Sequence, residues 1–128
     1  MSAVNEQVGG SHYKNLAYQP AQLCAKIGLN GFQYDMLSYV TRYKNKNGQQ
    51  DLEKIIHWTH LGEELTPKNF CSFSKETSQE VQNYISANML SSVVGEIVCS
   101  IVLQDWDSIR LKTELLIDLE YASEKDAQ

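Results

Sequence analysis

The stretch NGFQYDMLSYVTRYKNKNG, residues 30–48, carries the signals of one amphipathic helix with a defined start and end. Asn30 can cap the helix, and Gln33, three residues later, completes a capping box. Apolar side chains then recur at helical spacing, at Phe32, Met36, Tyr39, Val40 and Tyr43. The pattern predicts a helix from Gly31 to about Asn45, which Gly48 ends.

Two further helices are predicted in the first half of the chain. Pro20 suits the first turn of a helix and Gly28 suits its end, so one helix is expected between them. Another is expected over 50–64, with Asp51 in its first turn, where the helix dipole favours an acid. Its apolar face is formed by Leu52, Ile55, Ile56 and Trp58.

The second half predicts a loop over 66–75 and then two helices. Thr77-Ser-Gln-Glu80 is a capping box, so a long helix is expected over 77–102. Asp105 or Asp107 can cap a last helix. The apolar residues of that helix are Ile109, Leu111, Leu115, Leu116 and Leu119.

These helices predict an all-α fold of about five helices in two layers. We expect a small helical domain over 1–65 and an acidic helical hairpin over 66–128. Small side chains recur at every fourth position of the hairpin, at Ala87, Ser91, Gly95 and Cys99. Such a ridge allows close helix packing, either within the chain or in a homo-oligomer formed through residues 77–122.

Charge is unevenly divided along the 128 residues, whose net charge is −5. Residues 1–64 hold six basic and six acidic side chains, whereas residues 65–128 hold five basic and ten acidic ones. Non-specific duplex DNA binding needs an excess of Lys and Arg and is therefore not expected. The neutral balance of the first half still allows a local basic site.

Several other classes of protein are disfavoured. The most apolar stretch, 89–103, contains Glu96 and is too short to cross a bilayer. The three cysteines are widely spaced, as in reduced intracellular proteins, and no CxxC pair suggests zinc. His57 and His60 lack a carboxylate at ligand spacing, so no metal site is expected. Walker A and GxGxxG motifs are also absent.

Two segments have the composition of a nucleotide site. His12, Tyr13 and Lys14 follow two glycines and combine groups suited to stacking on a base and contacting phosphate. The second segment is a cluster of cations between two predicted helices, formed by Arg42, Lys44, Lys46 and Lys54. These cations could bind phosphate near a helix N-terminus, or simply complement the dipole of the preceding helix.

The order of these segments resembles the DUF3310 family of bacteriophage proteins, which includes a nucleotide kinase without a Walker motif. The resemblance covers about residues 10–62. It is carried by Ser11-His12-Tyr13, Gln19-Pro20, the run Tyr39-Val-Thr-Arg42-Tyr43-Lys44-Asn-Lys46-Asn-Gly48, and Asp51-Leu52-Glu-Lys54 with Trp58. It implies nucleotide binding through His12, Tyr13, Lys14, Tyr39, Arg42, Tyr43, Lys44, Lys46 and Lys54.

The resemblance also implies phosphoryl transfer to a nucleoside monophosphate, with Mg²⁺. Arg42 and Lys46 would neutralise phosphates, and Asp51 would orient the metal or Lys54. The chain departs from the family pattern where members carry Gly-Asn and a Lys, and has Tyr34-Asp35 and Ser38 instead. Because phosphoryl transfer depends on positioning and charge, this departure weakens the expectation of catalysis more than that of nucleotide binding. Kinase activity is still expected ahead of the capture of a nucleotide signal.

Three functions therefore remain open. The first is a phage nucleotide kinase in the host cytoplasm. The second is a binding module that captures a nucleotide or a cyclic nucleotide immune signal without chemistry. The third is an acidic inhibitor of a host defence or nucleic-acid-binding protein, steered to its partner by charge.

Overall fold

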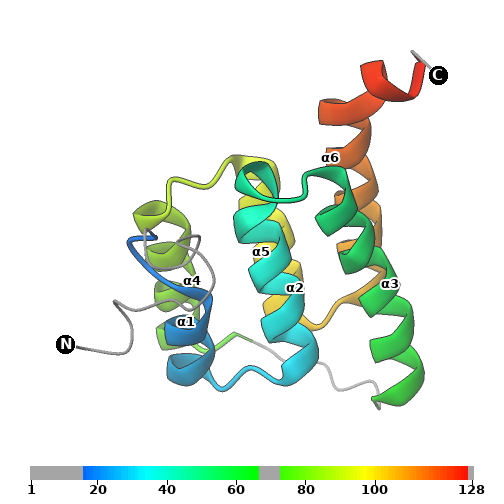
Figure 1. The fold of residues 1–128 in the computed structure, drawn as a ribbon. Helices are drawn as coiled ribbons and strands as arrows, with labels where there is room; N and C mark the ends of the chain where they lie inside the picture. Colours follow the sequence, from blue (N-terminus) through cyan, green and yellow to red (C-terminus); the bar gives the residue numbers. More distant parts are fainter. Residues whose placement is uncertain (1–15, 67–72, 127–128) are drawn as a thin grey trace.

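The computed structural model describes residues 16–66 and 73–126. Within these ranges every regular element is a helix, which confirms the all-α class, with six α-helices instead of about five. In chain order they are α1 (Pro20–Ile27), α2 (Gly31–Arg42), α3 (Gln49–Leu65), α4 (Lys75–Ala87), α5 (Ser92–Leu103) and α6 (Trp106–Asp126), with a short 3₁₀ helix, η2 (Tyr43–Asn45), after α2 (Figure 1).

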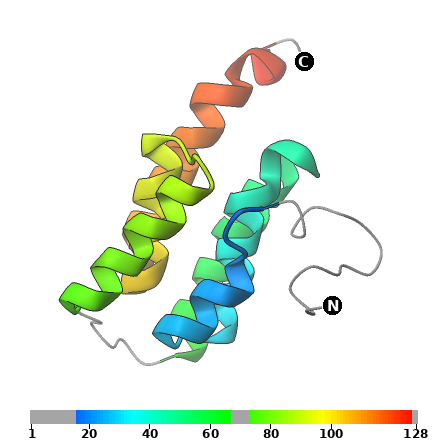
Figure 2. The same cartoon turned by 90° about the vertical axis from the view of Figure 1, so that its left-hand side faces the viewer.

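The helices form two layers, and each half of the chain supplies one. Figure 2 shows α1, α2 and α3 on one side and α4, α5 and α6 on the other. Across the layers α1 contacts α4, α2 contacts α5, and α3 contacts α6. The two halves therefore bury their apolar faces against each other.

One core lies between the layers and draws on both. Its fully buried members include Leu23, Met36, Leu37, Leu52 and Ile55 from the first layer. The second layer contributes Val81, Tyr84, Ile97, Val98, Ile101 and Ile109. Burying each large apolar side chain contributes about 1.5–3 kcal/mol. Apolar burial between the layers is therefore a major source of stability.

Helix starts in the first layer follow the predicted capping signals. The Asn30 side chain accepts a hydrogen bond from the Gln33 backbone at 2.9 Å, and the Gln33 side chain accepts one from Asn30 at 2.8 Å. The Gln33 amide also donates to the carbonyls of Ile101 and Val102, both at 3.1 Å. The capping box of α2 thus also ties the two layers together.

The predicted single helix over 77–102 is wrong, because the chain turns between α4 and α5. Met89 adopts a left-handed conformation, with φ 51°, and ends α4. The Ser91 hydroxyl then accepts a hydrogen bond from Val94 and caps α5. The start is also earlier than expected, since Ser74 caps α4 through the Thr77 backbone. Consequently the predicted ridge of small residues is divided between two helices.

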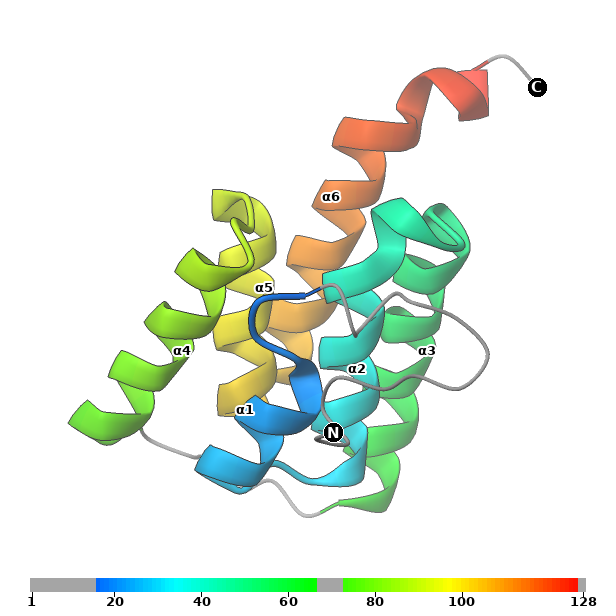
Figure 3. The same ribbon diagram turned by 60° about the vertical axis from the view of Figure 1, so that its left-hand side comes forward.

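The apolar residues predicted for the last helix are only partly buried. Ile109 and Leu116 lie in the core, whereas Leu111, Leu115 and Leu119 are exposed. The sequence of α6 has apolar residues on two faces, and the face that includes Ile109 packs against α3 and α5. In Figure 3 the C-terminal turns of α6 project past the ends of its neighbours.

Close packing between α3 and α6 depends on a glycine. A Cβ atom at Gly62 would lie 2.6 Å from the ring of Trp106, which is itself buried. Beside it, Arg110 of α6 forms an ion pair with Glu63 at 2.8 Å. None of the described helices is both long and apolar enough to cross a membrane.

Candidate functional site

The predicted cations lie around the turn between α2 and α3, which packs beside the C-terminal part of α6 (Figure 3). We call Arg42, Lys44, Lys46 and Lys54 the basic turn. The short helix η2 and Gly48 reverse the chain here. Gly48 has φ 57° and ψ −126°, a backbone conformation that residues other than glycine rarely adopt. This backbone geometry brings the end of α2 next to the first turn of α3.

A fully buried carboxylate, that of Asp51, connects two of the cations. Its Oδ2 atom lies 3.7 Å from Nε of Arg42, and its Oδ1 atom lies 3.5 Å from Nζ of Lys54. Asn47 donates a 3.3 Å hydrogen bond to Oδ1. The Arg42 side chain is only 15% exposed, whereas that of Lys54 is 39% exposed. Asp51 therefore positions both cations from the protein interior, and Lys54 extends to the solvent.

The same two cations lie over one aromatic ring. The guanidinium of Arg42 is 5.1 Å from the centroid of the Tyr39 ring, and Nζ of Lys54 is 5.3 Å from it. Both distances are within the range of cation–π attraction. Tyr39, Arg42, Asp51 and Lys54 thus form one connected cluster, as their proximity in the predicted motif suggested.

A second set of contacts joins the turn to α6. The hydroxyl of Tyr43 donates to both carboxylate oxygens of Glu120 at 2.8 Å, and Lys44 lies 3.6 Å from the same carboxylate. Burial, together with the bond to Glu120, raises the pKa of Tyr43 above its ordinary value. Tyr121 packs so closely on Gly48 that an added Cβ would lie 3.2 Å from its hydroxyl. Tyr43 is therefore a buried anchor for α6.

Lys46 differs from the other cations of the basic turn. It is exposed and forms no ion pair within the described residues. The basic turn holds four cations against two paired carboxylates, those of Asp51 and Glu120. It therefore keeps a surplus of positive charge beside the N-terminus of the 17-residue helix α3, where the helix dipole also favours anions.

One part of the predicted site is not described by the structure. His12, Tyr13 and Lys14 lie outside the described residues. Two residues that sequence reasoning missed contact the predicted site residues, Asn47 at Asp51 and Glu120 at Tyr43 and Lys44. Asn47 precedes Asp51 by four residues, a spacing that could have signalled the contact. Glu120 reaches the turn from the far end of the chain, and no local pattern indicates it.

Magnesium, which the resemblance implies for phosphoryl transfer, does not fit the Asp51 carboxylate. Both oxygens face cations and the side chain is completely buried. A Mg²⁺ ligand needs an accessible oxygen and room for bound water. Across the described ranges, no three His, Cys, Asp or Glu side chains group as metal ligands do.

The positions that depart from the family pattern lie on α2. Tyr34 is exposed, Asp35 is half-buried, and Ser38 is buried beneath the helix. The Ser38 hydroxyl has no hydrogen-bond partner among the described residues. Ser38 therefore contributes neither charge nor an accessible polar group to the surface of the basic turn.

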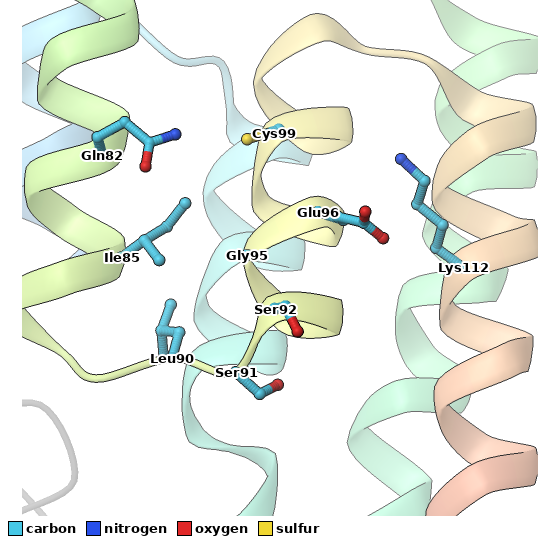
Figure 4. Close-up of a pocket in the computed structure, with 9 residues that line it drawn as sticks. All are labelled: Gln82, Ile85, Leu90, Ser91, Ser92, Gly95, Glu96, Cys99 and Lys112. Atoms are coloured by element: carbon cyan, nitrogen blue, oxygen red, sulfur yellow. The ribbon is translucent and has the colours of Figure 1, made fainter.

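A separate groove of about 290 Å³ lies on the second layer, between α4 and α6 (Figure 4). Ile85 and Leu90 form one wall, Lys112 stands on the other side, and Gly95 and Cys99 of α5 form the floor. Burial raises the pKa of the Cys99 thiol, which disfavours the reactive thiolate. No residue of the basic turn lines this groove.

Comparisons of the chain with protein families, with curated proteins and with solved structures found no match. The basic turn therefore supplies the chemistry from which a function can be proposed.

Proposed function

We propose that the chain is a nucleotide-binding protein that holds the phosphate groups of its ligand at the basic turn. The supporting observation is the surplus of positive charge there, on the accessible side chains of Lys44, Lys46 and Lys54. Tyr39 adds an aromatic surface next to the ammonium group of Lys54. Lysines near a helix N-terminus are suited to binding phosphate.

In this proposal Arg42 and Asp51 are positioning residues. Asp51 holds Arg42 and Lys54 close together, so that two like charges remain adjacent without separating the helices. The ligand supplies the further negative charge that the surplus cations favour. The resemblance to the DUF3310 family is consistent with this assignment, and with a phage protein that acts in the host cytoplasm.

We further propose binding without phosphoryl transfer, in preference to kinase activity. Asp51 is the carboxylate that was expected to orient a metal. Its oxygens pair with Arg42 and Lys54, and its side chain is inaccessible to solvent. Catalysis of this reaction requires charge stabilisation of the transferring group, commonly with an accessible metal. A cyclic nucleotide and a nucleoside monophosphate share the phosphate chemistry, so both are candidate ligands.

Thermal shift with mono-, di-, tri- and cyclic nucleotides tests the proposal, with inorganic phosphate as a further probe. A ligand at 100 times its Kd stabilises the fold by about 2.7 kcal/mol. Lys46→Ala is expected to weaken binding about tenfold, the effect of one charge-assisted contact. Lys75→Ala is the matched control, because it removes an exposed lysine from the distant start of α4.

Two outcomes would contradict the proposal. The first is a melting temperature that no nucleotide raises, which would favour the acidic inhibitor instead. The second is equal affinity in the Lys46→Ala and Lys75→Ala variants, which would move the site away from the basic turn. Incubation with a nucleoside monophosphate, a triphosphate and Mg²⁺ distinguishes binder from kinase, since a binder returns both nucleotides unchanged.

A further inference from the structure

The groove on the second layer has an apolar end and a charged end. Ile85 and Leu90 form the apolar end, and both are half-buried. Lys112 and Glu96 lie at the charged end (Figure 4). Gly95, which has no side chain, lies on the floor between them, so one space of about 290 Å³ connects the two ends. The groove therefore offers apolar and ionic contacts to the same occupant.

A buried hydroxyl holds the ammonium group of Lys112 in place. Nζ of Lys112 donates a 3.2 Å hydrogen bond to Oγ of Ser100, a residue that is only 3% exposed. The Ser100 hydroxyl is itself fixed, since it donates to the backbone carbonyl of Glu96 at 3.0 Å. An ammonium group has three N–H donors, and Lys112 pairs with no carboxylate within residues 16–66 and 73–126. Lys112 is therefore a positioned cation that can still bind an anion.

Glu96 supplies the opposite charge at the same end of the groove. Its side chain is exposed, and it too forms no ion pair in the part of the chain that the structure describes. Burial is the main cause of the raised pKa of the Cys99 thiol, and the charges of Lys112 and Glu96 act on that pKa in opposite directions. One cation and one anion therefore both lie near the thiol on the groove floor.

We propose that this groove binds a small zwitterion with an apolar side chain, of the class of the free aliphatic amino acids. The ligand carboxylate accepts hydrogen bonds from Lys112, and the ligand ammonium group pairs with Glu96. The apolar side chain of the ligand contacts Ile85 and Leu90. A ligand with a single charge would leave one of the two opposite groups without a partner. The volume of about 290 Å³ is at the lower end of the range for ligand pockets, which suits a ligand of this size.

This site is separate from the basic turn. The groove lining holds one cation and one anion, so its charges balance, whereas the basic turn has the surplus of positive charge that phosphate requires. Lys46→Ala is therefore expected to leave amino acid binding unchanged, and Lys112→Met is expected to leave nucleotide binding unchanged. Failure of one proposal leaves the other standing.

Titration of the ¹⁵N-labelled full chain, followed by two-dimensional amide NMR, tests the ligand class. L-leucine is expected to bind with a Kd of about 1 mM and to shift the amide signals of Gly95 and Cys99. The probe 4-methylpentanoate lacks only the ammonium group and is expected to bind about threefold more weakly, the effect of one exposed ion pair. The probe 3-methylbutylamine lacks only the carboxylate and is expected to bind about tenfold more weakly.

Two variants test the two charges of the groove. Lys112→Met is expected to raise the Kd of L-leucine about tenfold, and Glu96→Gln about threefold. The matched controls are Lys75→Met and Glu114→Gln, because each removes an exposed charge that does not line the groove. Both controls are expected to bind L-leucine as the wild type does. Far-ultraviolet circular dichroism checks that all four variants fold.

Three outcomes would overturn the proposal. The first is that L-leucine at about 10 mM, ten times the expected Kd, shifts no amide signal of the groove. The second is that 4-methylpentanoate binds the wild type as tightly as L-leucine does, since Glu96 then contributes nothing. The third is equal affinity for L-leucine in Lys112→Met and Lys75→Met. The first two use the wild type and so do not depend on the folding of any variant.

Discussion

Replacing Asp51 by asparagine removes one buried charge and almost no volume. Its two cations lie 3.7 Å and 3.5 Å away, each worth about 4–5 kcal/mol of Coulomb attraction at an effective dielectric constant of about 20. Lys54 is 39% exposed, so solvent reduces its share to about 0.2–1 kcal/mol. Arg42 is far less exposed, and leaving its charge without the buried partner dominates the cost.

The free energy of unfolding is therefore expected to fall by about 3–5 kcal/mol, the usual cost of breaking a buried ion pair. This is a large fraction of the roughly 5–15 kcal/mol that stabilises a typical domain. Urea unfolding, followed by circular dichroism, measures the change. Glu53→Gln is the matched control, because Glu53 is an exposed carboxylate on the same helix, and its effect is expected within about 0.5 kcal/mol.

Combining Arg42→Met with Asp51→Asn gives a second measure of the interaction between the two buried charges. The double variant removes both charges, so it is expected to lose less stability than the two single variants added together. A loss below about 1 kcal/mol for Asp51→Asn would refute the reasoning, since such a value fits an exposed pair and not a buried one. Strict additivity in the double variant would refute it as well.

Three other outcomes are expected. Gly62→Ala places a Cβ 2.6 Å from the Trp106 ring and is expected to cost about 1–3 kcal/mol in urea unfolding, despite the better helix propensity of alanine. Gly31→Ala, which meets open space, is expected to cost nothing, and an equal loss in both would contradict the packing argument. Tyr43→Phe loses a bifurcated hydrogen bond to the Glu120 carboxylate and is expected to cost about 1.5–3 kcal/mol, while an unchanged midpoint would show that this anchor is dispensable. Burial raises the pKa of Cys24 from 9.0 to about 11, and the pKa of Tyr43 is raised as well. The fold thus favours the neutral forms of the Cys24 thiol and the Tyr43 hydroxyl. Their contribution to the free energy of unfolding is complete below pH 9, and it is lost as the pH rises through the raised pKa values. The melting temperature is expected to fall between pH 9 and 11 for this reason, and a constant value over that range would contradict the assignment.

Local signals predicted the first layer well. The capping box of Asn30 and Gln33, together with Pro20 and Gly28, marks helix boundaries through contacts within a few residues. Such contacts are encoded in adjacent sequence, and so they can be recognised without the fold.

The break after α4 depends on distant residues. Asn88 exchanges hydrogen bonds with the backbone of Tyr18, donating at 2.6 Å and accepting at 3.0 Å, and these bonds hold the chain where Met89 turns. No glycine or proline marks the position. A contact across 70 residues has no local signature, so the apolar pattern alone suggested one continuous helix.

The sequence indicated some of the contacts at the candidate site, but not their burial. The spacing of Arg42, Asp51 and Lys54 indicated that two helix ends meet. It did not indicate that Asp51 is fully buried between the cations. That burial depends on how α2, α3 and α6 pack, as does the arrival of Glu120 from the C-terminal helix.

The division of the two layers between the two halves of the chain has a consequence for biosynthesis. A ribosome adds about 5–20 residues per second, so the 63 residues after the first layer take roughly 3–13 s to make. Isolated helices form within about a microsecond. The apolar inner faces of α1, α2 and α3 therefore remain uncovered for seconds, until the helices of the second layer have been synthesised. During that interval the nascent chain presents Met36, Leu37 and Ile55 to whatever binds emerging apolar segments.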